Sequence, residues 1–141
     1  MRHPGPDARG FSLAELALVL ALAALLAWIG AHSWQDLARS QRRAEGRAAL
    51  ARTMQLQERH FSRHGRYREY QAGDGADFPR HSGPTPEASS YRLSAVACAD
   101  APLDACVLLR ADASFPDPEC GALMLDSRGR QGAQGEGARC W

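Results

Sequence analysis

The sequence predicts an α+β protein in which a long N-terminal helix packs against a small antiparallel β-sheet. An apolar run extends to Ala31 and leads into a more polar helical stretch. From Tyr91 onward apolar and polar residues alternate, which is the period of a half-buried strand. All four cysteines lie at or after Cys98, and an even set in a small domain indicates disulfides that staple the C-terminal loop.

The apolar run is long enough to cross a membrane. Between Glu15 and Asp36 there is no Asp, Glu, Lys or Arg. A helix of about 20 residues spans roughly 30 Å, the thickness of the hydrocarbon core of a bilayer. Arginines flank the run on both sides and leave its orientation ambiguous. The clustered cysteines and the short segment before the run favour a head that lies outside the cytoplasm.

Glu15 is an acid at the start of this apolar run and needs a physical reason. A carboxylate near the bilayer centre costs about 2.5–3.5 kcal/mol on insertion scales. If the chain were cut after Gly10, Phe11 would carry a free α-amino group one helical turn from Glu15. That amine could pair with the carboxylate of the same chain or of a neighbour, and the N-terminal end of the helix dipole also favours an acid.

The segment RGFSLAEL, from Arg9 to Leu16, resembles the class III signal of type IV pilins and pseudopilins. The resemblance implies the type IV pilin fold. It also implies that prepilin peptidase cuts after Gly10 and methylates Phe11, and that Glu15 docks the subunit into a filament. The alternative is an ordinary signal anchor that happens to contain a glutamate.

The four cysteines allow three pairings. We favour Cys98–Cys106 and Cys120–Cys140, because both close local loops, and the second closure stabilises by about 3 kcal/mol. Cys-x-x-Cys spacing is absent, so no metal and no cofactor are expected. The pattern from Cys120 to the final Cys140-Trp141 resembles the C-terminal loop of minor pilins of the PilE type.

The rest of the chain divides by its periodicity and its turn residues. Helix is expected to continue to His64, with Gly65 as its stop, and with Leu50, Met54 and Phe61 facing the sheet. A surface loop tacked down by aromatic residues follows, and Asp126–Gly129 fits a hairpin turn. Three strands are expected at 91–98, 106–111 and 121–126. The expected segments are a leader (1–10), a transmembrane and filament-core helix (11–32), the head half of the helix (33–64), a loop (65–90), and the sheet with its C-terminal disulfide loop (91–141).

Four arginines on the head half of the helix predict a basic stripe on an exposed face: Arg39, Arg42, Arg43 and Arg47. Such a stripe could meet lipid phosphates, acids of adjacent subunits or DNA, and a solvated face is the alternative. The net charge of the chain is only +1, so charge alone predicts no bulk affinity for nucleic acid.

These observations and the resemblance predict a minor structural subunit of a type IV pilus that supports pilus biogenesis, twitching and adhesion. The resemblance implies four partners: prepilin peptidase, other pilins in a helical filament, an inner-membrane assembly platform, and the lipid bilayer before assembly. The subunit would sit in the bacterial inner membrane with its head in the periplasm, and then in a cell-surface pilus. No catalytic arrangement is visible, so no enzyme is expected. The alternatives are a type II secretion pseudopilin, a competence DNA-receptor pilin and a lone membrane-anchored domain.

Overall fold

The computed structural model describes residues 12–71 and 77–141. They form one long helix and four strands in the order α1 (Leu13–His64), β1 (Tyr91–Ala97), β2 (Val107–Ala113), β3 (Leu123–Asp126) and β4 (Gln131–Ala133). The chain separates into two compact units, one ending at Ala38 and one comprising Arg39–Trp141. These elements confirm the predicted α+β fold, a long helix with a small antiparallel sheet. The leader lies outside the described residues.

The part of α1 in the first unit is apolar around its circumference. Its large apolar side chains are at least half exposed, whereas a helix on a soluble core would bury one stripe of them. Within the described residues, α1 is the one helix long and apolar enough to cross a membrane, with a mean hydropathy of 2.3 in its most apolar stretch. The exposed set includes Leu13, Leu16, Leu18, Val19, Leu20, Leu22, Leu25, Leu26, Trp28 and Ile29.

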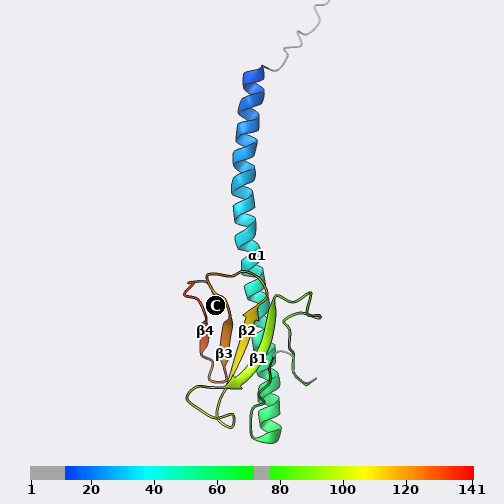
Figure 1. The fold of residues 1–141 in the computed structure, drawn as a ribbon, viewed down its shortest axis with the longest axis vertical. Helices are drawn as coiled ribbons and strands as arrows, with labels where there is room; N and C mark the ends of the chain where they lie inside the picture. The colour runs from blue at the N-terminus through cyan, green and yellow to red at the C-terminus, as the bar shows by residue number, and fades with distance from the viewer. Residues whose placement is uncertain (1–11, 72–76) are drawn as a thin grey trace, which may run out of the picture. The chain divides into compact units, whose positions relative to one another are not determined.

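The second unit, the head, is built on a four-stranded sheet in the order β1-β2-β3-β4 with every neighbouring pair antiparallel. Figure 1 shows the strands beside the second half of α1. On β1 and β2 the first, third and fifth residues are buried, as the two-residue period predicts. The core side chains of these two strands are Tyr91, Leu93, Ala95, Val107, Leu109 and Ala111.

The helix contributes both apolar and polar groups to this core. Leu50 is buried as expected, whereas Met54 and Phe61 are only partly buried against the core. Gln57 is fully buried, and the periodicity of apolar residues does not reveal it. Its amide donates to the carbonyl of Arg68 at 2.7 Å and accepts the Arg68 N–H at 2.9 Å. A buried glutamine is tolerated here because both ends of its amide are satisfied by backbone.

The helix ends at His64, where Gly65 adopts φ +69° and its N–H donates to the carbonyl of Phe61. The segment that follows is not simply a surface loop. Tyr67 and Tyr70 are buried, and isolated bridges join Tyr70 to Ala95 and His81 to Arg92 along the free edge of β1. The expectation of aromatic anchors is met, and the segment also covers a strand edge that would otherwise be open.

The far side of the sheet differs from the expected strands in its details. β2 continues two residues beyond Ala111, and β3 begins at Leu123 rather than at Gly121. Gly129 occupies the turn with φ +80°, as the Asp126–Gly129 motif predicts. The short strand β4 was not predicted, because its residues Gln131–Ala133 have low strand propensity and pair only through their backbone.

Candidate functional site

The beginning of α1 holds the carboxylate that the sequence singles out. Glu15 Oε2 accepts the backbone N–H of Ser12 at 3.0 Å, and Ser12 Oγ accepts the N–H of Ala14 at 3.3 Å. This reciprocal arrangement caps the first turn, whose backbone N–H groups have no partners within the helix. Glu15 therefore faces the N-terminal end of the helix and has a local role that the pilin resemblance does not mention.

Gly10 and Phe11, the expected processing site, lie outside the described residues. The position of Glu15 bears on them indirectly. Its carboxylate contacts the N–H of the residue that directly follows Phe11.

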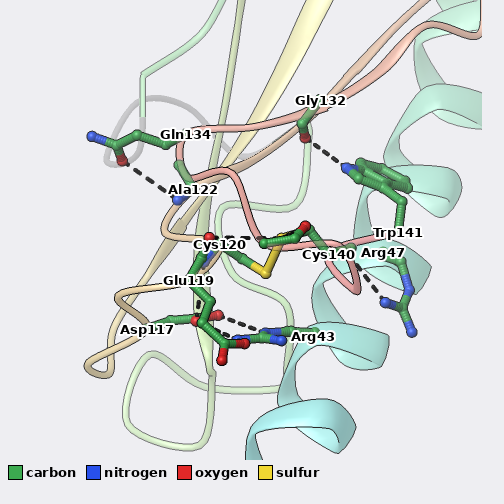
Figure 2. Close-up of a disulfide and its surroundings, with 11 residues drawn as sticks. Arg43, Arg47, Asp117, Glu119, Cys120, Ala122, Gly132, Gln134, Cys140 and Trp141 are labelled. Atoms are coloured by element: carbon green, nitrogen blue, oxygen red, sulfur yellow. Dashed lines mark hydrogen bonds and ion pairs between the residues drawn. A yellow bond between two sulfur atoms is a disulfide. The ribbon is translucent and has the colours of Figure 1, made fainter.

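Two disulfides close the C-terminal half of the head, Cys98–Cys106 and Cys120–Cys140. They match the two pairs that local loop closure favours. The second joins the segment before β3 to the end of the chain, as Figure 2 shows. Next to it, the indole of Trp141 donates to the carbonyl of Gly132 at 2.6 Å, so the last residue is also held against β4.

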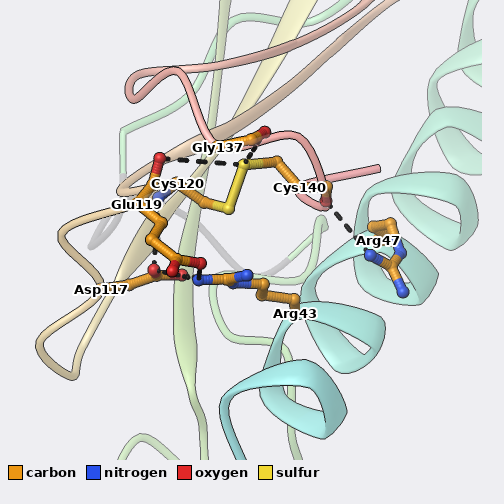
Figure 3. Close-up of polar contacts among 7 residues, drawn as sticks. All are labelled: Arg43, Arg47, Asp117, Glu119, Cys120, Gly137 and Cys140. Atoms are coloured by element: carbon orange, nitrogen blue, oxygen red, sulfur yellow. Dashed lines mark hydrogen bonds and ion pairs between the residues drawn. A yellow bond between two sulfur atoms is a disulfide. The ribbon is translucent and has the colours of Figure 1, made fainter. Parts of the chain in front are cut away.

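A buried ion network attaches this disulfide loop to α1 (Figure 3). Arg43 Nε donates to Asp117 Oδ2 at 2.8 Å and its Nη2 donates to Asp117 Oδ1 at 2.6 Å, a two-pronged ion pair. The same Nη2 also reaches Glu119 at 2.9 Å. The side chains of Arg43 and Asp117 are 6% and 0% exposed. Two parallel hydrogen bonds between a guanidinium and a carboxylate offset much of the free energy that the two charges lose when they are removed from water.

The prediction of an exposed basic stripe is therefore wrong, because not all four arginines are exposed. Arg43 is buried among acids, and Arg47 is half-buried and donates to the carbonyl of Cys140 at 3.1 Å. Arg42 is exposed and lies over the ring of Phe115 at 5.0 Å from its centroid. Arg43 and Arg47 thus hold the head together, and the four arginines present no continuous charged surface. The sequence carries no signal for this, because the partners of both residues lie more than 70 residues away.

The ion network shifts the acid–base behaviour of its members. The hydrogen bonds that Arg43 donates lower the pKa of Asp117, although burial alone would raise it. The backbone N–H of Cys120 also donates to Asp117 and lowers this pKa further. The carboxylate of Asp117 correspondingly raises the pKa of Arg43. Both groups are charged at neutral pH, so the network is an intact salt bridge under ordinary conditions.

One grouping in the head resembles a metal site in composition only. A sulfur of Cys98, a sulfur of Cys106 and a carboxylate oxygen of Asp126 lie within 4.8 Å of one another. The two sulfurs are bonded to each other, so neither is the thiolate that binds a metal. Asp126 instead accepts hydrogen bonds from Arg128 and Arg130 in the β3–β4 turn.

A basic cleft of about 490 Å³ lies at the C-terminal end of α1. Its walls carry three guanidinium groups, two imidazoles and one carboxylate. In the described part of the chain, neither Arg59 nor Arg63 pairs with an acid, whereas Arg68 meets Asp77 at 3.4 Å. The rings of His60 and His64 stack at 4.1 Å between centroids. In the sequence these histidines are only a pair one helical turn apart, and nothing local connects them with Arg68.

Comparison with known proteins identifies the class. The family model described as type IV minor pilin ComP, DNA uptake sequence receptor, matches residues 33–124. No curated protein matches the chain. Among solved structures, a type IV pilin from Shewanella oneidensis is similar, with 27% identity over 72% of this chain and 96% of that one, at a TM-score of 0.46.

The match of the family model covers more than half of the chain and includes most of the head. The protein is a type IV minor pilin. Within that class, the chain belongs to the ComP family of minor pilins. As a pilin it is a structural subunit that assembles with other pilins in a pilus, in a family not known for enzymes.

Proposed function

We propose that the chain is matured by cleavage after Gly10 and methylation of Phe11, and that Glu15 then docks it into the filament. The observation that carries this proposal is the contact between Glu15 and the Ser12 N–H, which holds a lone carboxylate at the start of an apolar helix. An acid there is costly in hydrocarbon unless a cation answers it. A newly formed amine on Phe11, in its own chain or in a neighbour, supplies that cation.

The subunit acts first in a membrane and then in a pilus, with different partners in each place. Before assembly, the apolar half of α1 spans the bacterial inner membrane with the head in the periplasm, where the two disulfides are stable. Prepilin peptidase and an inner-membrane assembly platform act on it there. After assembly, the subunit lies in a cell-surface pilus and supports pilus biogenesis, twitching and adhesion.

The substitution Glu15→Gln tests the docking role separately from helix capping. Glutamine keeps an oxygen that can accept the Ser12 N–H, so the helix cap survives, but it removes the charge. We expect the variant chain to be present in the membrane and strongly depleted from purified pili. Asp36→Asn is the matched control, because it removes one acid near the other end of the apolar run. Equal incorporation of the wild type and the Glu15→Gln variant would leave Glu15 with its capping role alone.

A second function, a receptor for DNA, is favoured by a specific feature of the head. The basic cleft presents Arg59 and Arg63 without acidic partners among the described residues, and guanidinium groups are well suited to phosphate. The description of the matching family as a DNA uptake sequence receptor makes DNA the first ligand to test. A DNA-binding role is compatible with membership of a pilus, because the cleft lies on the head and the proposed assembly depends on the apolar half of α1.

Binding of duplex DNA by the full-length chain in non-ionic detergent tests the receptor role. The interaction is expected to weaken as salt rises, because neutralising phosphates releases counterions. Fluorescence anisotropy at about 20 and 200 mM salt measures this directly. A complete lack of binding at the lower salt concentration removes the receptor role and leaves the filament role untouched.

A further inference from the structure

The basic cleft at the end of α1 is more specific than a charged helix end. Two of its arginines, Arg59 and Arg63, come from the last two turns of α1, and Arg68 comes from the segment after the helix. Positive groups in the last turn are favoured by the helix dipole, which accounts for Arg63 and His64. It does not account for Arg59, or for the approach of Arg68 from a second element.

The charge balance of the cleft is strongly positive. Three guanidinium groups face a single carboxylate, Asp77, whose side chain is 69% exposed and which pairs with Arg68. Like charges on one helix repel at this spacing, so leaving Arg59 and Arg63 without acids costs stability. An anion in the cleft would relieve that repulsion.

The histidines give the cleft a second property. Burial lowers the pKa of His60, as do the charges of His64, Arg68 and Arg63, and Asp77 opposes them. His64 stacks on His60, and its Nδ1 contacts the carbonyl of His60 at 3.0 Å. Phe78 packs edge-on against His60 at 5.8 Å. Negative charge added to the cleft would oppose the cations that lower the pKa of His60, so His60 is expected to take up a proton more readily when an anion is bound.

We propose that this cleft binds a phosphate of the nucleic-acid backbone through Arg59, Arg63 and Arg68, and that His60 makes the binding tighten as pH falls. The inference rests on the DNA-receptor role proposed above and assigns its location and its regulation. The bound phosphate favours the imidazolium form of His60, so the complex holds more protons than the free protein. By linkage, the binding constant then rises as pH falls through the histidine range.

Two pairs of substitutions with the same change in charge test the location. Arg59→Gln/Arg63→Gln removes two cations from the cleft, and Arg92→Gln/Arg139→Gln removes two exposed cations elsewhere on the head. Affinity of the full-length chain for a labelled DNA duplex is measured in detergent at about pH 7.5. We expect the cleft variant to bind about ten-fold more weakly with a shallower salt dependence, and the control to change much less. Equal weakening of both variants would show diffuse attraction and overturn the site.

A second series tests His60. Wild-type affinity should rise by about three-fold or more between about pH 7.5 and pH 5.5, and His60→Gln should lose most of that rise. A rise that persists in this variant overturns the pH dependence assigned to His60.

Two further outcomes separate this inference from the receptor role. If wild-type protein binds DNA and the cleft variant binds it equally well, the location fails while the receptor role stands. If wild-type protein binds no DNA but binds phosphatidylglycerol vesicles through Arg59 and Arg63, the receptor role and the nucleic-acid ligand both fail.

Discussion

The ring of Tyr91 lies directly against the backbone of Gly46. A β-carbon built on Gly46 would sit 2.8 Å from Tyr91 Cε2, closer than real β-carbons approach other atoms. Tyr91 is fully buried on β1 and meets Phe115 edge-on at 5.5 Å. The close approach of α1 to the sheet at this point therefore depends on the absence of a side chain at one helical position.

The first prediction concerns this contact. Gly46→Ala should lower the free energy of unfolding of the head by about 1–2 kcal/mol, because overpacking against the buried ring of Tyr91 outweighs the gain in helix propensity of about 1 kcal/mol. Near-UV circular dichroism during thermal unfolding reports on the aromatic core. Gly30→Ala is the control, since a β-carbon added at Gly30 would meet nothing within 4 Å. A stabilised Gly46→Ala head would contradict the tight approach.

The second prediction concerns the buried ion pair. Arg43→Met should destabilise the head by about 3–5 kcal/mol, because Asp117 is left buried and charged without its partner. Arg42→Met, one residue away and exposed, should cost about 1 kcal/mol or less, the value of its contact with Phe115. The double variant Arg43→Met/Asp117→Leu should recover much of the loss. Chemical denaturation of the three variants measures all of these differences, and similar losses for Arg42 and Arg43 would refute the network.

The third prediction concerns acid. The folded-state pKa of Asp117 lies below its ordinary value of 3.8, so the stability it contributes is present above that value and is lost as pH falls through the lower folded-state pKa. The thermal midpoint of the head should therefore drop steeply below about pH 4. Asp117→Asn should start from a lower midpoint and show a shallower decline over the same range. An unchanged slope would mean that other carboxylates carry the acid sensitivity.

The fourth prediction ranks the two disulfides. Cys120–Cys140 closes a longer stretch than Cys98–Cys106, with sequence separations of 20 and 8. The chain-entropy relation gives about 3.3 kcal/mol for the longer loop and about 2.5 kcal/mol for the shorter. Cys120→Ala/Cys140→Ala should therefore destabilise the head more than Cys98→Ala/Cys106→Ala, as measured by denaturant midpoints. The opposite ranking would show that residual structure in the unfolded chain dominates.

Local signals in the sequence were sufficient for much of the fold. The uncharged run after Glu15 predicts the membrane-length helix, Gly65 marks its end, and alternation from Tyr91 predicts β1. Each of these depends on residues close together in the chain. The disulfide pairs are also local, which is why the loop-closure argument favours them.

Long-range contacts account for what the sequence could not reveal. In the sequence, Arg43 is one of four nearby arginines, and only the folded structure shows that it pairs with Asp117, 74 residues away. Similarly, Gln57 has the sequence context of a polar surface residue, but in the structure the backbone of Arg68 satisfies both ends of its amide. The strand β4 carries Gly132 at its centre and forms only because β3 supplies a partner and Trp141 holds its backbone. Pairings of this kind depend on tertiary structure and leave no periodic pattern.

We propose that this minor pilin is cut after Gly10 and enters a filament through the helix that begins beside Glu15. Mass spectrometry of the chain's N-terminal peptide, from purified pili and from membranes, tests this most directly. We expect a peptide that begins at Phe11 and carries one added methyl group. A chain that begins at Met1, found in the membrane and absent from pili, would contradict the claim.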